Sequence, residues 1–222
     1  MSPVSGNLLM GLIIGICGSG SGSGKTAMAE ELLKSLTGGP AASGRGAASV
    51  WGAIKFTRTS VYTSVVTDTD VLRAEGKDTA RMLAAGAQRA AWVRSSGGAD
   101  LSEALSMALQ HLESPLESNC LEGQRHPLDG IIVEGNSAVE LLKPDIVIFM
   151  CGTSFKKGSE AFLGAADVVC DPGRRASVSA GAGKNKSRNR KAAVFCGLEM
   201  CVSEVLRLMK VGAKEPTDTP IA

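Results

Sequence analysis

One stretch of the chain combines residue types that bind phosphate. Residues 15–26 read GICGSGSGSGKT, in which glycine and serine alternate before Lys25 and Thr26. Phosphate oxygens must be met by several backbone N–H groups at once, and glycine permits the tight, closely approaching backbone that gathers them. Lys25 is expected to reach the β- and γ-phosphates, and the Thr26 hydroxyl to ligate Mg²⁺. The expected nucleotide contacts in this stretch are Gly20, Ser21, Gly22, Ser23, Gly24, Lys25 and Thr26.

The segments on either side give this stretch the context that a phosphate site needs. Residues 12–17 form an apolar run that predicts a buried strand, and residues 27–33 predict a helix. The start of such a helix offers unpaired N–H groups and a positive dipole end to an anion. A flexible glycine–serine linker is the alternative, but a linker does not join a strand to an amphipathic helix. Ser19 stands where the usual pattern has glycine, and a small side chain is expected to fit there.

The alternation of strands and helices predicts the fold class. Uniformly apolar strands are typical of a sheet that is covered on both sides. The sequence therefore predicts an α/β fold of the P-loop NTPase type, with a mostly parallel sheet and helices on both faces. Strands are predicted over residues 12–17, 50–57, 91–95, 131–133, 145–150, 167–170 and 192–196, and further helices over residues 101–112, 137–142, 158–166 and 198–209.

Acidic side chains follow some of these strands. Glu134 comes directly after residues 131–133, where a carboxylate that orients water or supports a metal ion is expected, and Gly135 would keep the backbone clear of the γ-phosphate. The alternative for Glu134 is an exposed residue at a strand end. Asp68 and Asp70 are candidate Mg²⁺ ligands, or one of them caps the turn that follows.

Charged residues near the predicted second strand add to the candidate site. Lys55 lies on that strand, which delivers it toward the ligand edge of the sheet. A helix is predicted next, with Asp78 or Thr79 as its N-cap and residues 80–89 as its body. Asp78 and Arg81 are then either a cap and a solvated charge, or residues that face the site or a dimer partner.

Length and composition indicate a single nucleotide-binding domain over residues 1–222. The chain is 44% hydrophobic and 21% charged, which is enough for one substantial core. A loop insertion is predicted over residues 37–49, a basic, disordered insertion over residues 173–191, and a C-terminal strand and helix over residues 192–211. The net charge of +2 gives no general attraction to nucleic acid or membranes. Six cysteines without disulfide spacing, and no recognisable secretory or spanning segment, predict a cytoplasmic protein.

These motifs together resemble one family. The phosphate-binding stretch, Lys55, the run GKDTARMLAAGA over residues 76–87 and the run IVEG over residues 132–135 are similar to successive motifs of the molybdopterin-guanine dinucleotide biosynthesis protein B family. The resemblance covers roughly residues 8–150. It implies a homodimeric P-loop protein that binds GTP with Mg²⁺ and hydrolyses it slowly. It also implies a role as an accessory factor to a nucleotidyl transferase in molybdenum cofactor, or related metallocofactor, biosynthesis.

Base recognition departs from the commonest GTPase pattern. The strand predicted over residues 145–150 is followed by CGTSFKK rather than Asn-Lys-x-Asp. Lys156 or Lys157 is expected to contact the base or the ribose, and ATP stays an alternative to GTP. A small-molecule kinase shares the phosphate-binding stretch but needs an arginine-bearing lid. A regulatory module would bind the nucleotide without turning it over.

Overall fold

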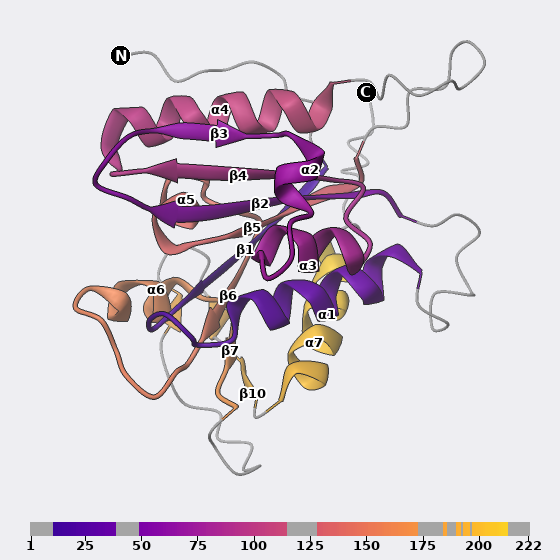
Figure 1. Cartoon of the computed structure of the whole chain (residues 1–222). Coiled ribbons are helices and arrows are strands. Elements are labelled where there is room, and N and C mark those ends of the chain that lie inside the picture. Colours follow the sequence, from indigo (N-terminus) through magenta and orange to yellow (C-terminus); the bar gives the residue numbers. More distant parts are fainter. Residues whose placement is uncertain are drawn as a thin grey trace, which may run out of the picture.

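An eight-stranded, mostly parallel sheet forms the centre of the protein (Figure 1). The computed structural model describes residues 11–38, 49–114, 128–172 and 197–212, together with 184–185, 190–191 and 193–195. The sheet has the strand order β10-β7-β6-β1-β5-β2-β4-β3, and only β3 runs antiparallel to its neighbour. Its strands are β1 (Leu12–Gly18), β2 (Trp51–Arg58), β3 (Ser64–Val66), β4 (Arg89–Ser95), β5 (Gly130–Glu134), β6 (Ile146–Met150), β7 (Val168–Cys170) and β10 (Ala193–Phe195).

Seven helices within the described residues accompany this sheet, so the expected α/β class with a mostly parallel sheet is confirmed. A separate two-stranded antiparallel ribbon is formed by β8 (Lys184–Asn185) and β9 (Arg190–Lys191). The helices are α1 (Lys25–Thr37), α2 (Thr69–Leu72), α3 (Asp78–Ala84), α4 (Gly98–Glu113), α5 (Asn136–Leu142), α6 (Ser159–Ala165) and α7 (Leu198–Gly212).

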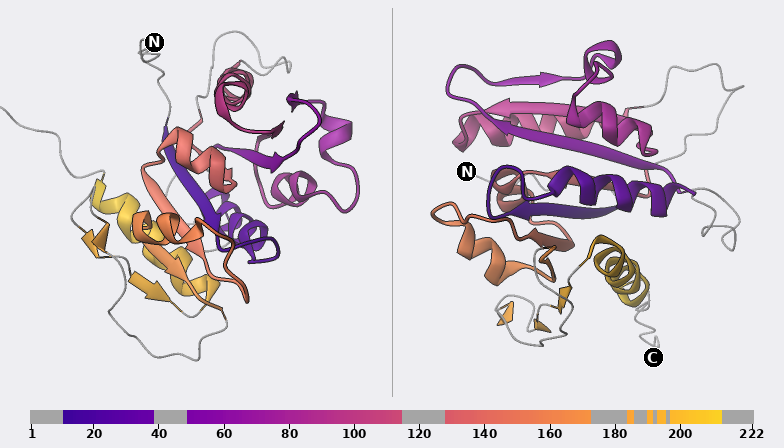
Figure 2. Two further views of the ribbon diagram at one scale, coloured as in Figure 1. Left: turned by 90° about the vertical axis from the view of Figure 1, so that its left-hand side faces the viewer. Right: turned by 60° about the horizontal axis from the view of Figure 1, so that its bottom comes forward.

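Helices cover both faces of the sheet. In Figure 1, α1, α3 and α7 lie in front of the strands, and the two further views in Figure 2 show the layers from other sides. The opposite face carries α4, α5 and α6, which contact the strands β1, β3, β4, β5 and β6. Parallel strands need such cover on both sides because every strand buries side chains above and below the sheet.

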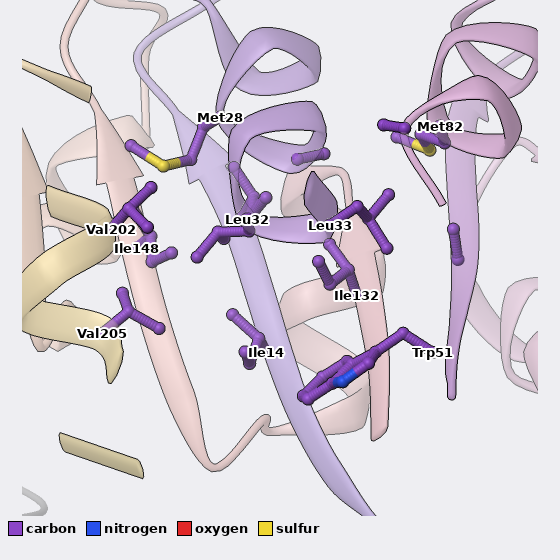
Figure 3. Packing of buried hydrophobic residues seen from close by; sticks show 14 of the residues in the cluster. Ile14, Met28, Leu32, Leu33, Trp51, Met82, Ile132, Ile148, Val202 and Val205 are labelled. Atoms are coloured by element: carbon purple, nitrogen blue, oxygen red, sulfur yellow. The ribbon is translucent and has the colours of Figure 1, made fainter. Parts of the chain in front are cut away.

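The core under α1 is built from apolar side chains that repeat with the period of a helix (Figure 3). Met28, Leu32 and Leu33 on α1 are fully buried against Ile14 and Ile132 of the central strands. Burying a side chain of this size stabilises the fold by roughly 1.5–3 kcal/mol. This packing fixes the start of α1 relative to the end of β1, and so fixes the loop that joins them.

The helix predicted over residues 80–89 is shorter than expected. Helix α3 ends at Ala84, and Arg89 already belongs to β4. Gly86 has a φ of 115° and donates its N–H to Leu83 O, while Ala87 donates to Met82 O. This pair of hydrogen bonds is the Schellman ending, and the left-handed residue that it requires is most easily supplied by glycine.

The strand order places the carboxyl ends of β1, β2 and β5 side by side. The chain leaves β1 for β2 on one side of it, returns to insert β5 between them, and then builds β6, β7 and β10 on the other side. Ligands of open α/β sheets bind at the carboxyl ends of strands, where such a change of direction occurs. A ligand is therefore expected at the carboxyl ends of β1 and β5.

Two predicted insertions lie mainly outside the described residues. Residues 39–48 of the predicted loop, and residues 173–183 and 186–189 of the basic insertion, belong to the ranges that the structure does not describe. The strand and helix expected over residues 192–211 correspond to β10 and α7. Among the described residues, no helix combines the length and the apolar character needed to cross a membrane.

Candidate functional site

The loop between β1 and α1 curls tightly because of two glycines. We call residues 19–24 the glycine-rich loop. Gly22 has a φ of 72° and Gly24 a φ of 87°, both in the left-handed region that other residues avoid. Gly24 is also the N-cap residue of α1, and no side chain caps this helix. The uncapped N–H groups at the start of α1 are therefore available to an anion.

Lys25 folds back over the glycine-rich loop. Its Nζ donates to Gly20 O at 2.6 Å and to Ser23 Oγ at 3.1 Å, which are both neutral acceptors. Burial lowers the pKa of Lys25, the charges of Lys55 and Lys156 lower it further, and Glu134 acts in the opposite direction. Among the described residues, no carboxylate forms an ion pair with Lys25. The ammonium group is thus held at the loop with its charge available to a phosphate.

A buried polar cluster lies next to this lysine. The Thr26 hydroxyl donates to Glu134 Oε2 at 3.0 Å, and Lys55 Nζ lies 2.5 Å from Glu134 Oε1 and 2.6 Å from Asp78 Oδ2. The Glu134 side chain is only 1% exposed, so this carboxylate depends on its two partners. The strand register brings Glu134 and Lys55 together, because Glu134 is paired with Lys55 of β2 on one side and with Ile16 of β1 on the other.

The charges in this cluster stabilise one another. Burial acts to lower the pKa of Lys55, but the carboxylates of Glu134 and Asp78 outweigh it and hold that pKa above its usual value. Burial acts to raise the pKa of Asp78, but its hydrogen bond and charge contact with Lys55, the nearby Thr26 hydroxyl and the charge of Arg81 outweigh it and lower that pKa. Lys55 and Asp78 are therefore both charged at neutral pH.

Asp78 is the second acid of this cluster, for which the sequence had suggested Asp68 or Asp70. The N-cap of α3 is Lys77, without a side-chain hydrogen bond, so the expectation that Asp78 or Thr79 caps the helix is wrong. Asp78 instead faces Lys55 and Thr26, because α3 packs against β2. Arg81, one turn further, forms an ion pair with Glu30 of α1 and holds α3 against α1.

The structure does not bring Asp68 and Asp70 to this cluster. Asp68 is the N-cap of α2, where its Oδ1 accepts from the N–H groups of Asp70 at 2.9 Å and Val71 at 3.1 Å. Both acids are exposed, and neither lines the cavity around Thr26. The expectation that they ligate a metal ion beside Thr26 is corrected accordingly, and the capping alternative describes Asp68.

The donors around Thr26 fit a hard divalent cation. A hydroxyl and two carboxylates supply oxygen ligands of the kind that Mg²⁺ prefers. In the described part of the chain, no three His, Cys, Asp or Glu side chains gather as a metal cage. Mg²⁺ is commonly held by one or two carboxylates together with substrate phosphates.

An open cavity of about 1490 Å³ surrounds the glycine-rich loop. Small-molecule sites usually measure roughly 300–1,000 Å³, so this cavity exceeds the room that one ligand needs. It begins at Lys25, Thr26 and Glu134 and continues between α5 and α6, where Val139 and Phe162 line it. Its other lining residues include Gly20, Ser21, Gly22, Gly24, Lys55, Asp78, Arg81, Gly135, Asn136, Lys156 and Lys157.

Gly135 is required for packing. Its φ is 133°, and a Cβ added there would lie 2.8 Å from Phe56 Cβ. Its N–H donates to Ile16 O at 3.0 Å, which ties the end of β5 to β1. The room for phosphate stays a prediction from the sequence, and the structure shows that packing against Phe56 by itself requires glycine here.

Asn136 and Ser19 are polar residues of the site whose contacts the sequence did not predict. Asn136 Oδ1 accepts from Gly18 N at 3.0 Å, and its Nδ2 donates to Gly18 O at 2.9 Å, so this side chain binds the backbone at the end of β1. Ser19 is fully buried and accepts a hydrogen bond from Gly152 N at 2.8 Å. The serine at position 19, where the usual pattern has glycine, was the feature of the sequence that could have indicated this contact.

Comparison of the chain with protein-family models, with curated proteins and with solved structures finds no match in any of the three. The functional assignment therefore rests on the residues of the site and on their geometry.

Proposed function

We propose that this chain is a P-loop nucleoside triphosphatase that depends on Mg²⁺. The observation that carries the proposal is the bond from Thr26 to the buried carboxylate of Glu134, formed beside Lys25 at the start of α1. A phosphate-binding lysine, a hydroxyl and a strand-end carboxylate are the parts that phosphoryl transfer needs, because this reaction depends on positioning and charge neutralisation.

Each residue has a role that follows from its surroundings. The N–H groups of the glycine-rich loop and of the start of α1 bind phosphate oxygens, and Lys25 exchanges its neutral acceptors for them. Thr26, with Asp78, would hold Mg²⁺, which would neutralise charge on the β- and γ-phosphates. Glu134 orients the attacking water, while Lys55 keeps the two carboxylates charged and in place.

GTP is the proposed nucleotide, and ATP is the alternative. Guanine is favoured only by the resemblance to the molybdopterin-guanine dinucleotide biosynthesis protein B family. Residues 151–157 lack the usual guanine-binding sequence and so give no support of their own. The same resemblance supports slow hydrolysis, a homodimer, and a role as accessory factor to a nucleotidyl transferase in molybdenum cofactor or related metallocofactor biosynthesis. The proposed cytoplasmic location rests instead on the cysteine pattern.

The test is a titration of GTP and ATP, with and without Mg²⁺, against the wild type and the Lys25→Ala variant. The proposal expects Mg²⁺-dependent binding and release of free phosphate, both lost in Lys25→Ala. Lys34→Ala, an exposed lysine on the same helix, is the matched control and should behave as wild type. Equal binding by Lys25→Ala and wild type would refute the proposal, and a preference for ATP would refute the guanine assignment.

A small-molecule kinase is the second candidate, because the cavity continues beyond the glycine-rich loop. The space between α5 and α6 is lined by Val139, Pro144, Val147 and Phe162, and an acceptor molecule would fit beside the phosphates there. Product analysis separates the two functions. A triphosphatase releases free phosphate, whereas a kinase yields a phosphorylated acceptor and little free phosphate.

A further inference from the structure

The loop that follows β6 is bound to the glycine-rich loop through Ser19. Ser19 N donates to Met150 O at 3.0 Å, its Oγ accepts from Gly152 N at 2.8 Å, and its O accepts from Lys156 N at 2.8 Å. All three contacts come from one fully buried residue. Figures 1 and 2 show this loop, in orange, beside the loop at the start of α1, in indigo.

Further contacts fix the conformation of the same loop. The ring of Phe155 stacks on Phe149 of β6, with ring centroids 6.0 Å apart. Ser159 Oγ donates to Lys156 O at 2.7 Å, and Ser159 N donates to the same oxygen at 3.0 Å. Both the carbonyl and the N–H of Lys156 are therefore held, so its backbone has a defined position over the site.

The Lys156 side chain lies over Gly20. A Cβ added at Gly20 would lie 3.7 Å from Lys156 Cγ and 3.8 Å from its Cε, so this lysine lies within ordinary van der Waals distance of that position. Lys25 donates to the carbonyl of the same glycine. The charge of Lys156 is close enough to that of Lys25 to contribute to lowering the Lys25 pKa. Two ammonium groups thus approach the glycine-rich loop from opposite segments of the chain.

These two lysines differ from Lys55 and Arg81, which also line the cavity. Lys55 is paired with Glu134 and Asp78, and Arg81 is paired with Glu30. Among the ion pairs of the described residues, none includes Lys25 or Lys156. Two like charges held together in this way repel each other, and a bound polyanion removes that repulsion.

We propose that Lys156 binds the polyphosphate of the nucleotide together with Lys25, and that Ser19 is the residue that positions it. The proposal deepens the proposed function and rests on it. It replaces the expectation that Lys156 contacts the base or the ribose. It also gives a physical reason for serine at position 19, since the hydroxyl joins the loop that carries Lys156 to the glycine-rich loop.

Inorganic tripolyphosphate separates a phosphate contact from a base contact, because it has neither base nor ribose. Calorimetry would compare its binding with that of GTP and ATP, in the presence of Mg²⁺, to the wild type and the Lys156→Ala variant. Removing a charge-assisted contact is expected to weaken binding of all three by about tenfold. Lys34→Ala is the control, an exposed lysine of α1 that does not line the cavity, and it should change none of them by more than about twofold.

Ser19→Ala keeps both backbone hydrogen bonds of this residue and removes only its hydroxyl. We expect weaker tripolyphosphate binding in this variant, and no additional loss when it is combined with Lys156→Ala. A Lys156→Ala variant that loses affinity for nucleotides but binds tripolyphosphate as the wild type does would overturn the proposal in favour of a base contact. Additive losses in the double variant would overturn the role of Ser19. A wild type that binds neither nucleotide nor tripolyphosphate would refute the proposed function, and this proposal with it.

Discussion

Replacing Lys55 by methionine tests the buried cluster most directly. Methionine keeps much of the length of the side chain and removes its charge, so Glu134 and Asp78 lose their common counter-charge. Breaking a buried ion pair by removing one partner costs roughly 3–5 kcal/mol. Asp78 is 38% exposed and Thr26 still donates to Glu134, so the expected loss of unfolding free energy is smaller, about 2–3 kcal/mol.

The pH dependence of this loss follows from the two shifted pKa values. The pKa of Asp78 is lowered in the folded protein, so its stabilisation is present above about pH 4 and is lost as the pH falls through the lowered value. The pKa of Lys55 is raised, so its stabilisation is complete below about pH 10.4 and is lost as the pH rises through the raised value. The difference between wild type and Lys55→Met should therefore be constant between these limits and shrink outside them.

Urea unfolding followed by tryptophan fluorescence measures this difference. With a slope of about 2 kcal/mol per molar urea, the midpoint of Lys55→Met should fall by about 1 M at pH 7. Lys34→Met, which removes an exposed pair with Glu31, should leave the midpoint unchanged. The double variant Lys55→Met/Glu134→Gln should recover part of the loss, since it no longer buries an unpaired charge. A Lys55→Met variant as stable as wild type at pH 7 would refute the reasoning.

Three further predictions concern single residues of the site and its neighbourhood. Glu134→Gln should keep nucleotide binding and reduce phosphate release by about 100-fold, whereas Glu199→Gln, an exposed residue of α7 outside the cavity, should leave both unchanged. Unchanged turnover in Glu134→Gln would favour a nucleotide-binding regulatory module. Gly135→Ala should lower the unfolding free energy by about 1–3 kcal/mol, because of the positive φ of Gly135 and the contact with Phe56. Gly164→Ala in α6, with open space around it, should raise the unfolding free energy by up to about 1 kcal/mol. Equal urea midpoints for the two variants would contradict this difference. Burial raises the pKa of the Cys17 thiol to about 12, so this thiol should not react with a maleimide at pH 8 in the folded protein. The half-buried Cys151 should be labelled in the folded protein, and Cys17 only after unfolding. Mass spectrometry of the peptides would show which cysteine is labelled.

The strands and helices could largely be predicted from the sequence, because apolar runs and helical spacing are local signals. The glycine-rich loop was predicted for the same reason, since a strand, a run of small residues and a helix follow one another along the chain. The end of α3 was misjudged, because alanine-rich residues 84–87 favour a helix locally while Gly86 takes a left-handed conformation that ends it. The sequence pattern Gly86-Ala87 did not by itself exclude a longer helix.

The sequence by itself determined the α/β class and the lysine and threonine at the start of α1, because these depend on neighbours in the chain. Only the tertiary structure decided which aspartate joins Lys55 and Glu134 beside Thr26. Asp68 and Asp70 are as acidic as Asp78, but the position of α3 over β2 brings Asp78 to Lys55, while α2 uses Asp68 as its cap. The role of Ser19 was likewise decided by the fold, since its partner Gly152 is 133 residues away in the sequence and meets it through the pairing of β1 with β6.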